Sequence, residues 1–501
     1  YECCNHTLRV LLQRMGWVID NPHACYEPVI GIESVLKCRG PVTPTTRRVV
    51  YEVEIKETGA DPEPYVIADA LMYGDGQKIV RFTDMSVKLT GVTGVELQSF
   101  WSLRNRRMDA FPSSFENPTS PRYTREQILA FAVGKPSKAF GERYLPFDQD
   151  RFIARLPGPP YSFVDRIISA EPEPWVLKPD GWVVAEYDVP PDAWYFRADR
   201  SGTMPFCVLL EIPLQACGWT AAYMGSALRS DSDLKFRNLG GKAVLYRPVG
   251  PDAGQLTMRV RLTRVSQAGG MIIQTYDLKI LNTGETLYEG ETTFGFFSPD
   301  ALIQQVGIQP AGEKPYQPSL EEIAEGASHR FADEAPLTPD DLAVDPAPSL
   351  AMPAKALRMI DRVDLFVPNG GPHGLGFIRG SKTVDPDEWF FSAHFYQDPV
   401  CPGSLGIESF LQLLKFAALK RWRHLKESHR FEILCEDPHS WIYRGQIVQS
   451  NRTVEVDAVI TRIEEGDSPA MWANGYLKVD GLFIYQMENF AIRLVPIHSP
   501  G

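Results

Sequence analysis

One stretch of the sequence carries a base and an acid on either side of a turn. In HFYQDPVCPGSLGIE, residues 394–408, His394 precedes a turn rich in Pro and Gly, and Glu408 follows where an apolar run begins. A second stretch, MPFCVLLE, repeats the turn and ends in Glu211, but no histidine precedes it. Imidazole has an ordinary pKa of about 6.5 and can accept a proton near pH 7, and a carboxylic acid in an apolar site can donate one. The pattern therefore indicates general acid–base chemistry.

The two acids lie at the start of predicted helices. Apolar residues between Leu405 and Leu419 cover more than one helical face, which indicates a helix buried on nearly all sides. Pro213 follows Glu211 by two residues, and we expect it in the first turn of the corresponding helix, where proline costs no backbone hydrogen bond.

Predicted strands follow the second helix. Alternating patterns at 452–463, 469–479 and 482–495 indicate strands, and Asp480-Gly481 indicates a tight hairpin between the last two. The sequence therefore predicts an α+β fold in which an antiparallel sheet wraps a long central helix, and a generic α+β domain is the alternative.

Internal repeats organise the chain. SFVDRI resembles RMIDRV and AWYF resembles EWFF, at offsets of about 195 to 198 residues. Repeat B therefore spans about 152–298 and repeat C about 350–496. The N-terminal residues match only the later part of repeat C, at an offset of about 405, which places Glu2 at the position of Glu408. Repeat A thus enters the chain at its acid.

The repeats and the Pro-rich stretches between them predict five segments. The chain opens at Tyr1 inside a predicted helix, so we expect it to be part of a larger protein. The expected segments are 1–95, the C-terminal part of a domain whose first half is missing; 96–150, a linker in which REQILAFAVG predicts a short helix; 151–300, a domain without the histidine; 301–349, a Pro-rich acidic linker; and 350–497, a domain with the histidine.

Composition excludes several classes of function. A hydrophobic content of 44% is enough for a buried core, and a net charge of -12 argues against a nucleic-acid partner. No uninterrupted apolar run approaches about 18 residues, which argues against a membrane span. The eight cysteines form no CxxC pair, so we expect no disulfide framework and no zinc site, and a cytoplasmic location.

The motif around His394 resembles a known family. WFFSAHFYQDPVCPGSLGIES is similar to the signature of the 3-hydroxyacyl-[acyl-carrier-protein] dehydratases of the hot-dog fold, the FabA-like enzymes. The whole chain further resembles the tandem dehydratase region of polyunsaturated fatty acid synthases, in which a histidine-less hot dog precedes each one that carries the histidine. The resemblance implies tandem hot dogs: a partial one at 1–95, a histidine-less one at 151–300 and a catalytic one at 350–497.

The resemblance also implies which residues meet. In homodimeric members, the histidine of one subunit works with the acid on the central helix of its neighbour. Within one chain this pairs His394 with Glu211 and leaves Glu408 facing a site where Asp199 takes the histidine's position. Glu2 is then the orphan acid of the truncated repeat. Simple bacterial members have Asp on the helix, whereas this chain has Glu, and Glu408 remains the alternative partner of His394.

Dehydration of a 3-hydroxyacyl thioester needs a base for the C2 proton and an acid for the departing C3 hydroxyl. His394 suits the first task, and Glu211 suits the second if burial raises its pKa. Gly403 with Ser404, at a helix start, is the candidate oxyanion and thioester site. Phe391 and Phe410 are candidates for lining an acyl tunnel. The resemblance implies no cofactor, because the substrate arrives on the phosphopantetheine of an acyl carrier protein.

Other interpretations stay open at this point. Asp398 near His394 is a weak metal pattern with no third ligand, and Cys207 and Cys401 suit apolar packing better than nucleophilic catalysis. The resemblance leaves open a further activity, movement of the double bond from trans-2 to cis-3, in polyunsaturated fatty acid or polyketide-like lipid synthesis. The alternatives are a hot-dog thioesterase and a non-catalytic carrier-docking module of a megasynthase. We expect an acyl carrier protein and other synthase domains as partners, and homodimerisation is compatible with the family.

Overall fold

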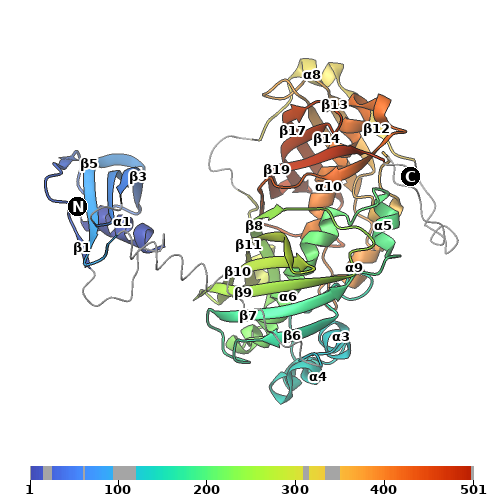
Figure 1. Cartoon of the computed structure of the whole chain (residues 1–501), viewed down its shortest axis with the longest axis horizontal. Coiled ribbons are helices and arrows are strands. Elements are labelled where there is room, and N and C mark those ends of the chain that lie inside the picture. The colour runs from blue at the N-terminus through green and yellow to red at the C-terminus, as the bar shows by residue number, and fades with distance from the viewer. Residues whose placement is uncertain are drawn as a thin grey trace. The chain divides into compact units, whose positions relative to one another are not determined.

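The computed structural model describes residues 2–14, 25–59, 63–93, 120–308, 315–332 and 350–497. The chain divides into two compact units, Tyr1–Glu116 and Asn117–Gly501 (Figure 1). The described residues contain no helix that is both long enough and apolar enough to cross a membrane.

The first unit packs a helix against an antiparallel sheet. Within its described residues, Leu8 and Leu12 of the helix are buried against Val66, Phe82 and Met85 of the sheet. The sheet follows the order β1-β5-β4-β3, with β2 also paired to β5. Its elements are α1 (Glu2–Arg14), β1 (Cys25–Glu27), β2 (Val35–Cys38), β3 (Val49–Gly59), β4 (Tyr65–Gly74) and β5 (Gln77–Thr90).

The second unit contains one continuous antiparallel sheet shared by repeats B and C. In its described residues the sheet has 14 strands in the order β12-β13-β14-β17-β18-β19-β16-β8-β11-β10-β9-β7-β6, with β15 paired to β19. Figure 1 shows it running from β13 at the top of the view to β6 at the bottom. The repeats join where β16 pairs with β8, from His439 opposite Ala243 to Ile442 opposite Gly240.

The strands of each repeat follow one another in a common pattern. Those of repeat B are β6 (Arg166–Ala170), β7 (Asp180–Asp188), β8 (Lys235–Leu245), β9 (Gln255–Ala268), β10 (Met271–Asn282) and β11 (Glu285–Phe297). Those from the second linker onward are β12 (Ala327–Arg330), β13 (Arg362–Val367), β14 (Phe377–Thr383), β15 (His429–Ile433), β16 (His439–Tyr443), β17 (Thr453–Glu464), β18 (Ala470–Val479) and β19 (Leu482–Pro496).

A long helix lies inside the curved sheet of each repeat. Helix α6 (Phe206–Tyr223) is buried at nearly every position, and α10 (Gly403–Arg421) is buried from Ser404 through Ala418. Both begin directly after a proline, Pro205 or Pro402. Burial on all sides follows from the apolar residues that cover every face of these helices. The predicted α+β class, with tandem helix-in-sheet units, is confirmed.

The position of Pro213 differs from the prediction. Helix α6 begins at Phe206, so Pro213 lies inside the helix rather than in its first turn. A proline there has no N–H to donate to the carbonyl of Leu209. The burial of the surrounding helix outweighs this local cost, because tertiary packing supplies most of the stability of a helix in a protein.

Shorter helices complete the second unit. The stretch expected as a linker contains α3 (Arg125–Val133), α4 (Pro136–Phe140) and the 3₁₀ helix η1 (Glu142–Asp148), whose residues Ile128, Phe131 and Tyr144 belong to the core of the unit. The predicted helix REQILAFAVG corresponds to α3. The remaining short helices are α5 (Trp194–Asp199), η2 (Ser226–Arg229), α7 (Pro299–Ile303), α8 (Leu320–Glu325), η3 (Lys355–Leu357), α9 (Trp389–Ala393) and η4 (Arg423–Leu425).

Candidate active site

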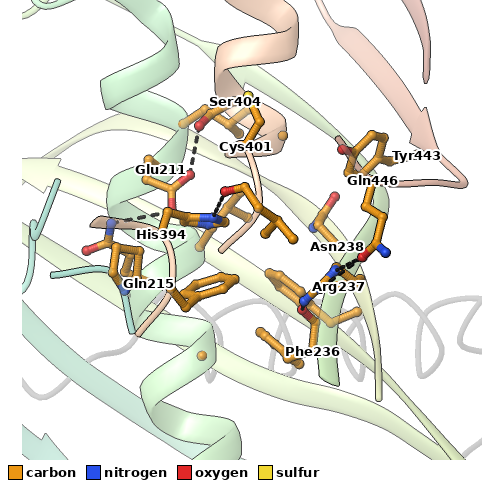
Figure 2. Close-up of a pocket in the computed structure, with 18 of the residues that line it drawn as sticks. Glu211, Gln215, Phe236, Arg237, Asn238, His394, Cys401, Ser404, Tyr443 and Gln446 are labelled. Carbon is orange, nitrogen blue, oxygen red and sulfur yellow. Dashed lines mark hydrogen bonds between the residues drawn. The ribbon is translucent and has the colours of Figure 1, made fainter. Parts of the chain in front are cut away.

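A cavity lies between repeats B and C, with about 60 Å³ of space that a water-sized molecule can enter. Repeat B contributes one face of α6 and the start of β8, and repeat C contributes the loop after α9 and the first turn of α10 (Figure 2). The structure therefore brings His394, Glu211, Gly403 and Ser404 to one cavity, although they come from two repeats.

His394 follows the end of α9 and is held as a neutral base. Its side chain is buried, with 8% exposed, and its Nδ1 lies 3.0 Å from the Val400 carbonyl oxygen. A carbonyl can only accept, so Nδ1 carries the proton and Nε2 keeps its lone pair. Burial, helped by the nearby positive charge of Arg237, lowers the pKa of His394 to about 3 against the opposing effect of the hydrogen bond to Val400. The imidazole is thus uncharged at neutral pH.

An ion cluster from the other repeat holds the loop that carries His394. Asp398 accepts hydrogen bonds from Arg237 at 2.7 and 3.1 Å and from Lys235 at 2.7 Å, and both cations belong to β8. Arg237 also donates to Gln446 at 2.9 and 3.0 Å (Figure 2). Burial would raise the pKa of Asp398, but the Arg237 guanidinium holds it below its ordinary value. The loop is therefore anchored by a charged, buried contact across the repeats.

Glu211 lies on α6 and is held near its protonated form. It is 5% exposed, and burial raises its pKa to about 7 against the hydrogen bonds it accepts. Ser404 donates to its Oε2 at 2.8 Å, and the amide of Gln215 donates to its Oε1 at 3.3 Å. Near neutrality, a substantial fraction of this carboxyl carries a proton that it can donate.

Neighbouring polar groups orient this carboxyl. The hydroxyl oxygens of Tyr161 and Ser404 lie 2.9 Å apart, and because Ser404 donates to Glu211, Tyr161 is the donor. The amide of Gln215 accepts from the Phe163 N–H at 2.8 Å and donates to the Tyr161 carbonyl at 2.8 Å. These bonds fix the amide so that its NH₂ faces Glu211.

Gly403 is the first residue of α10 and lines the cavity. The first N–H groups of a helix lack partners within the helix, and the helix dipole there favours negative charge. The N–H groups of this turn are thus suited to stabilising an oxyanion. A Cβ added at Gly403 would make an ordinary van der Waals contact with the Tyr443 ring, at 3.5 Å.

The other predicted acids lie elsewhere. Glu408 is 1% exposed and faces a different cavity, with Asp199 and Lys415. Glu2 is the first residue of α1, but its side chain lies outside the described residues. The structure therefore places Glu211, and not Glu408, in the cavity of His394.

An apolar pocket adjoins the first cavity at Cys401, which lines both. It lies between α10 and the sheet of repeat C and has about 30 Å³ of space that a water-sized molecule can enter. Phe391 and Leu405 line it. Phe410 does not line this pocket and is fully buried beside Gly475 and Phe490.

Sequence reasoning missed three residues of the site: Gln215, Tyr161 and Arg237. Gln215 had a signal, because Gln412 occupies the same place four residues after the acid of repeat C. Tyr161 and Arg237 have no comparable signal, since each acts across a long separation in the chain. Asp398 is no metal ligand here, because its oxygens accept from Arg237 and Lys235. The described residues contain no group of three His, Cys, Asp or Glu side chains that could hold a metal ion.

Comparisons with known proteins identify a family and a relative of this chain. The FabA-like domain family matches three parts of the chain, residues 8–83, 156–291 and 352–488. A polyunsaturated fatty acid synthase component from Thraustochytrium sp. is 25% identical over 98% of this chain, and the match covers 40% of that protein. This chain thus spans well under half the length of that relative.

Solved structures resemble the chain more distantly. A dehydratase domain from the CurJ module of curacin polyketide synthase has a TM-score of 0.36 and 12% identity, covering 66% of this chain and 96% of that one. A dehydratase domain of a trans-AT polyketide synthase from Brevibacillus brevis has a TM-score of 0.39 and 11% identity, covering 67% and 98%. The acyl-CoA thioesterase II TesB2 of Mycobacterium marinum has a TM-score of 0.31 and 12% identity, covering 64% and 94%. With TM-scores below 0.5, these likenesses are too weak to indicate the function of this chain.

Proposed function

The chain belongs to the FabA-like family, and from that premise we propose that it dehydrates 3-hydroxyacyl thioesters on an acyl carrier protein to 2-enoyl thioesters. One observation carries the proposal: an uncharged imidazole and a carboxyl with a pKa of about 7 come from two different repeats and line the same cavity. A base and an acid that are both neutral at the start are what an elimination of water requires.

In the proposed reaction, Nε2 of His394 takes a proton from C2 of the substrate. The electron pair of that C–H bond forms the C2–C3 double bond, and the C3–O bond breaks as Glu211 protonates the departing hydroxyl. The products are the 2-enoyl thioester and water. His394 is left protonated and Glu211 ionised, and proton exchange with solvent restores both before the next turnover.

Charge that develops on the thioester oxygen also needs a partner. The N–H groups of Gly403 and Ser404 open α10 at the cavity and are proposed as donors to this oxygen. Ser404 would have two roles, because its hydroxyl also donates to Glu211. One helix start would thereby orient the acid and stabilise the enolate.

The apolar pocket beyond Cys401 is proposed to hold the acyl chain. It adjoins the first cavity at Cys401 and is lined mainly by apolar side chains of repeat C. Apolar surface of this kind binds an alkyl or alkenyl chain through burial from water. The thioester would then lie beside His394 while the chain extends into repeat C.

The carrier and the wider assembly follow from the same proposal. The substrate would be carried on phosphopantetheine by an acyl carrier protein, and the neighbouring domains of a lipid synthase would supply and remove it. In this proposal, protein side chains alone carry out the dehydration. Movement of the new double bond from trans-2 to cis-3 is an additional outcome that the same assay detects.

The test compares three variants in dehydration and in reverse hydration of carrier-bound or short thioesters. We expect His394→Ala and Glu211→Gln to lose about 10²- to 10⁴-fold in kcat/KM, because each removes a proton-transfer group. Glu408→Gln is the matched control, since Glu408 occupies the same helical position in the other repeat, and it should retain activity within about threefold.

Three results would contradict the proposal. Activity in Glu211→Gln together with loss in Glu408→Gln would show that the acid is assigned to the wrong repeat. Thioester hydrolysis that survives His394→Ala would favour a thioesterase instead. Carrier binding without turnover in the unmodified protein would favour a docking module.

A further inference from the structure

A second cavity mirrors the first across the two repeats. It has about 20 Å³ of space that a water-sized molecule can enter, and Glu408 of α10 and Asp199 at the end of α5 line it. Glu408 corresponds to Glu211 in the repeats, and Asp199 to His394. The two repeats have thus exchanged roles: here repeat C supplies the helical acid and repeat B supplies the loop.

The acid of the second cavity is held as in the first. Gln412 donates to Glu408 at 2.9 Å and to the Leu357 carbonyl at 2.8 Å, and it accepts from the Met359 N–H at 2.9 Å. These three bonds repeat those of Gln215. Cys207 occupies the place of Ser404 and hydrogen-bonds to Glu408. The acid and its glutamine are therefore held alike in the two cavities, but the histidine is absent and Phe206 takes the position of Gly403.

The two cavities differ at one position of their central helices, where the side chains have different size and charge. Seven residues after the acid, α6 has Gly218 and α10 has Lys415, and each lines its own cavity. The ammonium of Lys415 lies 2.5 Å from a carboxylate oxygen of Asp199 and 3.7 Å from one of Glu408. The three side chains are 8%, 4% and 1% exposed. Lys415 thus bridges carboxylates from both repeats in a site nearly free of water.

The other polar groups around this cavity are already paired. Glu432 lines it, but its carboxylate accepts hydrogen bonds from Arg430 and Arg493. Ser201 donates to Asp199. Burial keeps the Cys207 thiol protonated by raising its pKa. Within the described residues, Lys415 is the cation in ion-pair contact with both Asp199 and Glu408.

We infer that Lys415 takes up space that Gly218 leaves open in the first cavity, and that it compensates two buried carboxylates that join repeat B to repeat C. The role of the first cavity as a substrate site rests on the proposed function. The stabilising role of Lys415 does not rest on it, because thermal unfolding measures that role directly. The second cavity is then a structural tie between the repeats instead of a second acyl site.

Thermal unfolding of the full chain tests the inference through Lys415→Met. This variant keeps the side-chain volume but leaves Asp199 and Glu408 without a cation, so we expect the Tm at about pH 8 to fall by about 5 °C or more. In the variant, Glu408 loses the Lys415 charge that lowers its pKa in the unmodified protein, so burial should raise the pKa of Glu408 further. The destabilisation should therefore shrink as pH falls to about 5.5, where Glu408 takes up a proton.

Two further variants make the result specific. Adding Asp199→Asn to Lys415→Met removes one unpaired charge and should recover at least about half of the lost Tm at pH 8. Lys420→Met, an exposed lysine on the same helix, should shift the Tm by less than about 1 °C at either pH. A Lys415→Met loss that is independent of pH, or no recovery with Asp199→Asn, would overturn the inference.

Activity distinguishes this inference from the proposed function. Below its Tm, Lys415→Met should dehydrate substrate within about twofold of the unmodified protein, because Lys415 does not line the first cavity. Loss of turnover in the folded variant would contradict a purely structural role. If the unmodified protein dehydrates nothing, the proposed function fails while the unfolding results still decide the role of Lys415.

Discussion

At the scale of single residues, one physical effect tunes both reacting groups. Burial disfavours the charged form of any ionisable side chain, so it lowers the pKa of His394 and raises that of Glu211. The same dry cavity therefore yields a neutral base and a largely neutral acid. No separate charge is needed to set the two protonation states.

The pH dependence of kcat/KM follows from these directions. Glu211 must carry its proton before each turnover, and its pKa is about 7. We expect the rate to fall about tenfold per pH unit above neutrality. His394 has a pKa of about 3 and stays a free base, so the rate should remain level from neutrality down to about pH 5. Initial rates across this range measure both limbs.

Ser404→Ala gives the internal control for that profile. The Ser404 hydroxyl donates to Glu211 and lowers its pKa. Removing the hydroxyl should raise the pKa of Glu211 and move the falling limb to higher pH, whatever the change in maximal rate. A limb that stays in place would mean that another group controls it.

At the scale of elements, the turn into α10 separates two cavities. Cys401 lies in this turn, and its side chain is shared by the catalytic cavity and the apolar pocket behind it. Its buried thiol has a pKa above its ordinary value and is suited to packing instead of nucleophilic attack. Because Cys401 lines both cavities, we expect its size to decide whether an acyl chain can pass from one to the other.

Cys401→Trp tests whether the acyl chain passes this point. A large ring should block the apolar pocket, and we expect kcat/KM for a chain of about twelve carbons to fall about tenfold or more relative to one of about four carbons. Cys401→Ala is the control and should leave this ratio within about threefold. Equal losses for both chain lengths in Cys401→Trp would place the acyl chain elsewhere.

At the scale of the whole second unit, the two repeats act as one body. They share a continuous sheet through β8 and β16, and β8 of repeat B also supplies Arg237 to Asp398 of repeat C. The loop that carries His394 thus depends on a strand of the other repeat. A single repeat would lack both the acid and this anchor.

Arg237→Met should therefore affect stability and rate together. Removing one partner of a buried ion pair leaves Asp398 with Lys235 alone, and we expect the free energy of unfolding to fall by about 3 kcal/mol or more. The loosened loop should also lower kcat. Lys235→Met is the matched control: Lys235 is 30% exposed, so its loss should cost about 1 kcal/mol or less. Urea unfolding and kcat measure both effects, and equal losses in the two variants would contradict the assigned anchor.

Local sequence patterns predicted much of the secondary structure. The apolar faces predicted the buried helices, and the alternating stretches predicted strands β17, β18 and β19, because these periods reflect the geometry of each element. Comparison of repeats B and C could also have identified Gln215, because Gln412 occupies the corresponding position. Pro213 was misplaced because its cost depends on where the helix begins, and packing carries α6 past that residue.

The sequence by itself determined the α+β class and the residue types able to move protons. The local pattern alone left Glu211 and Glu408 equivalent, because both follow the same turn on the same kind of helix, and only the family resemblance favoured Glu211. Tertiary structure separated them: pairing of β8 with β16 brings residues about two hundred positions apart together, so that Glu211 meets His394 and Glu408 meets Lys415. Such contacts depend on how strands pair across the whole chain, and no local pattern encodes them.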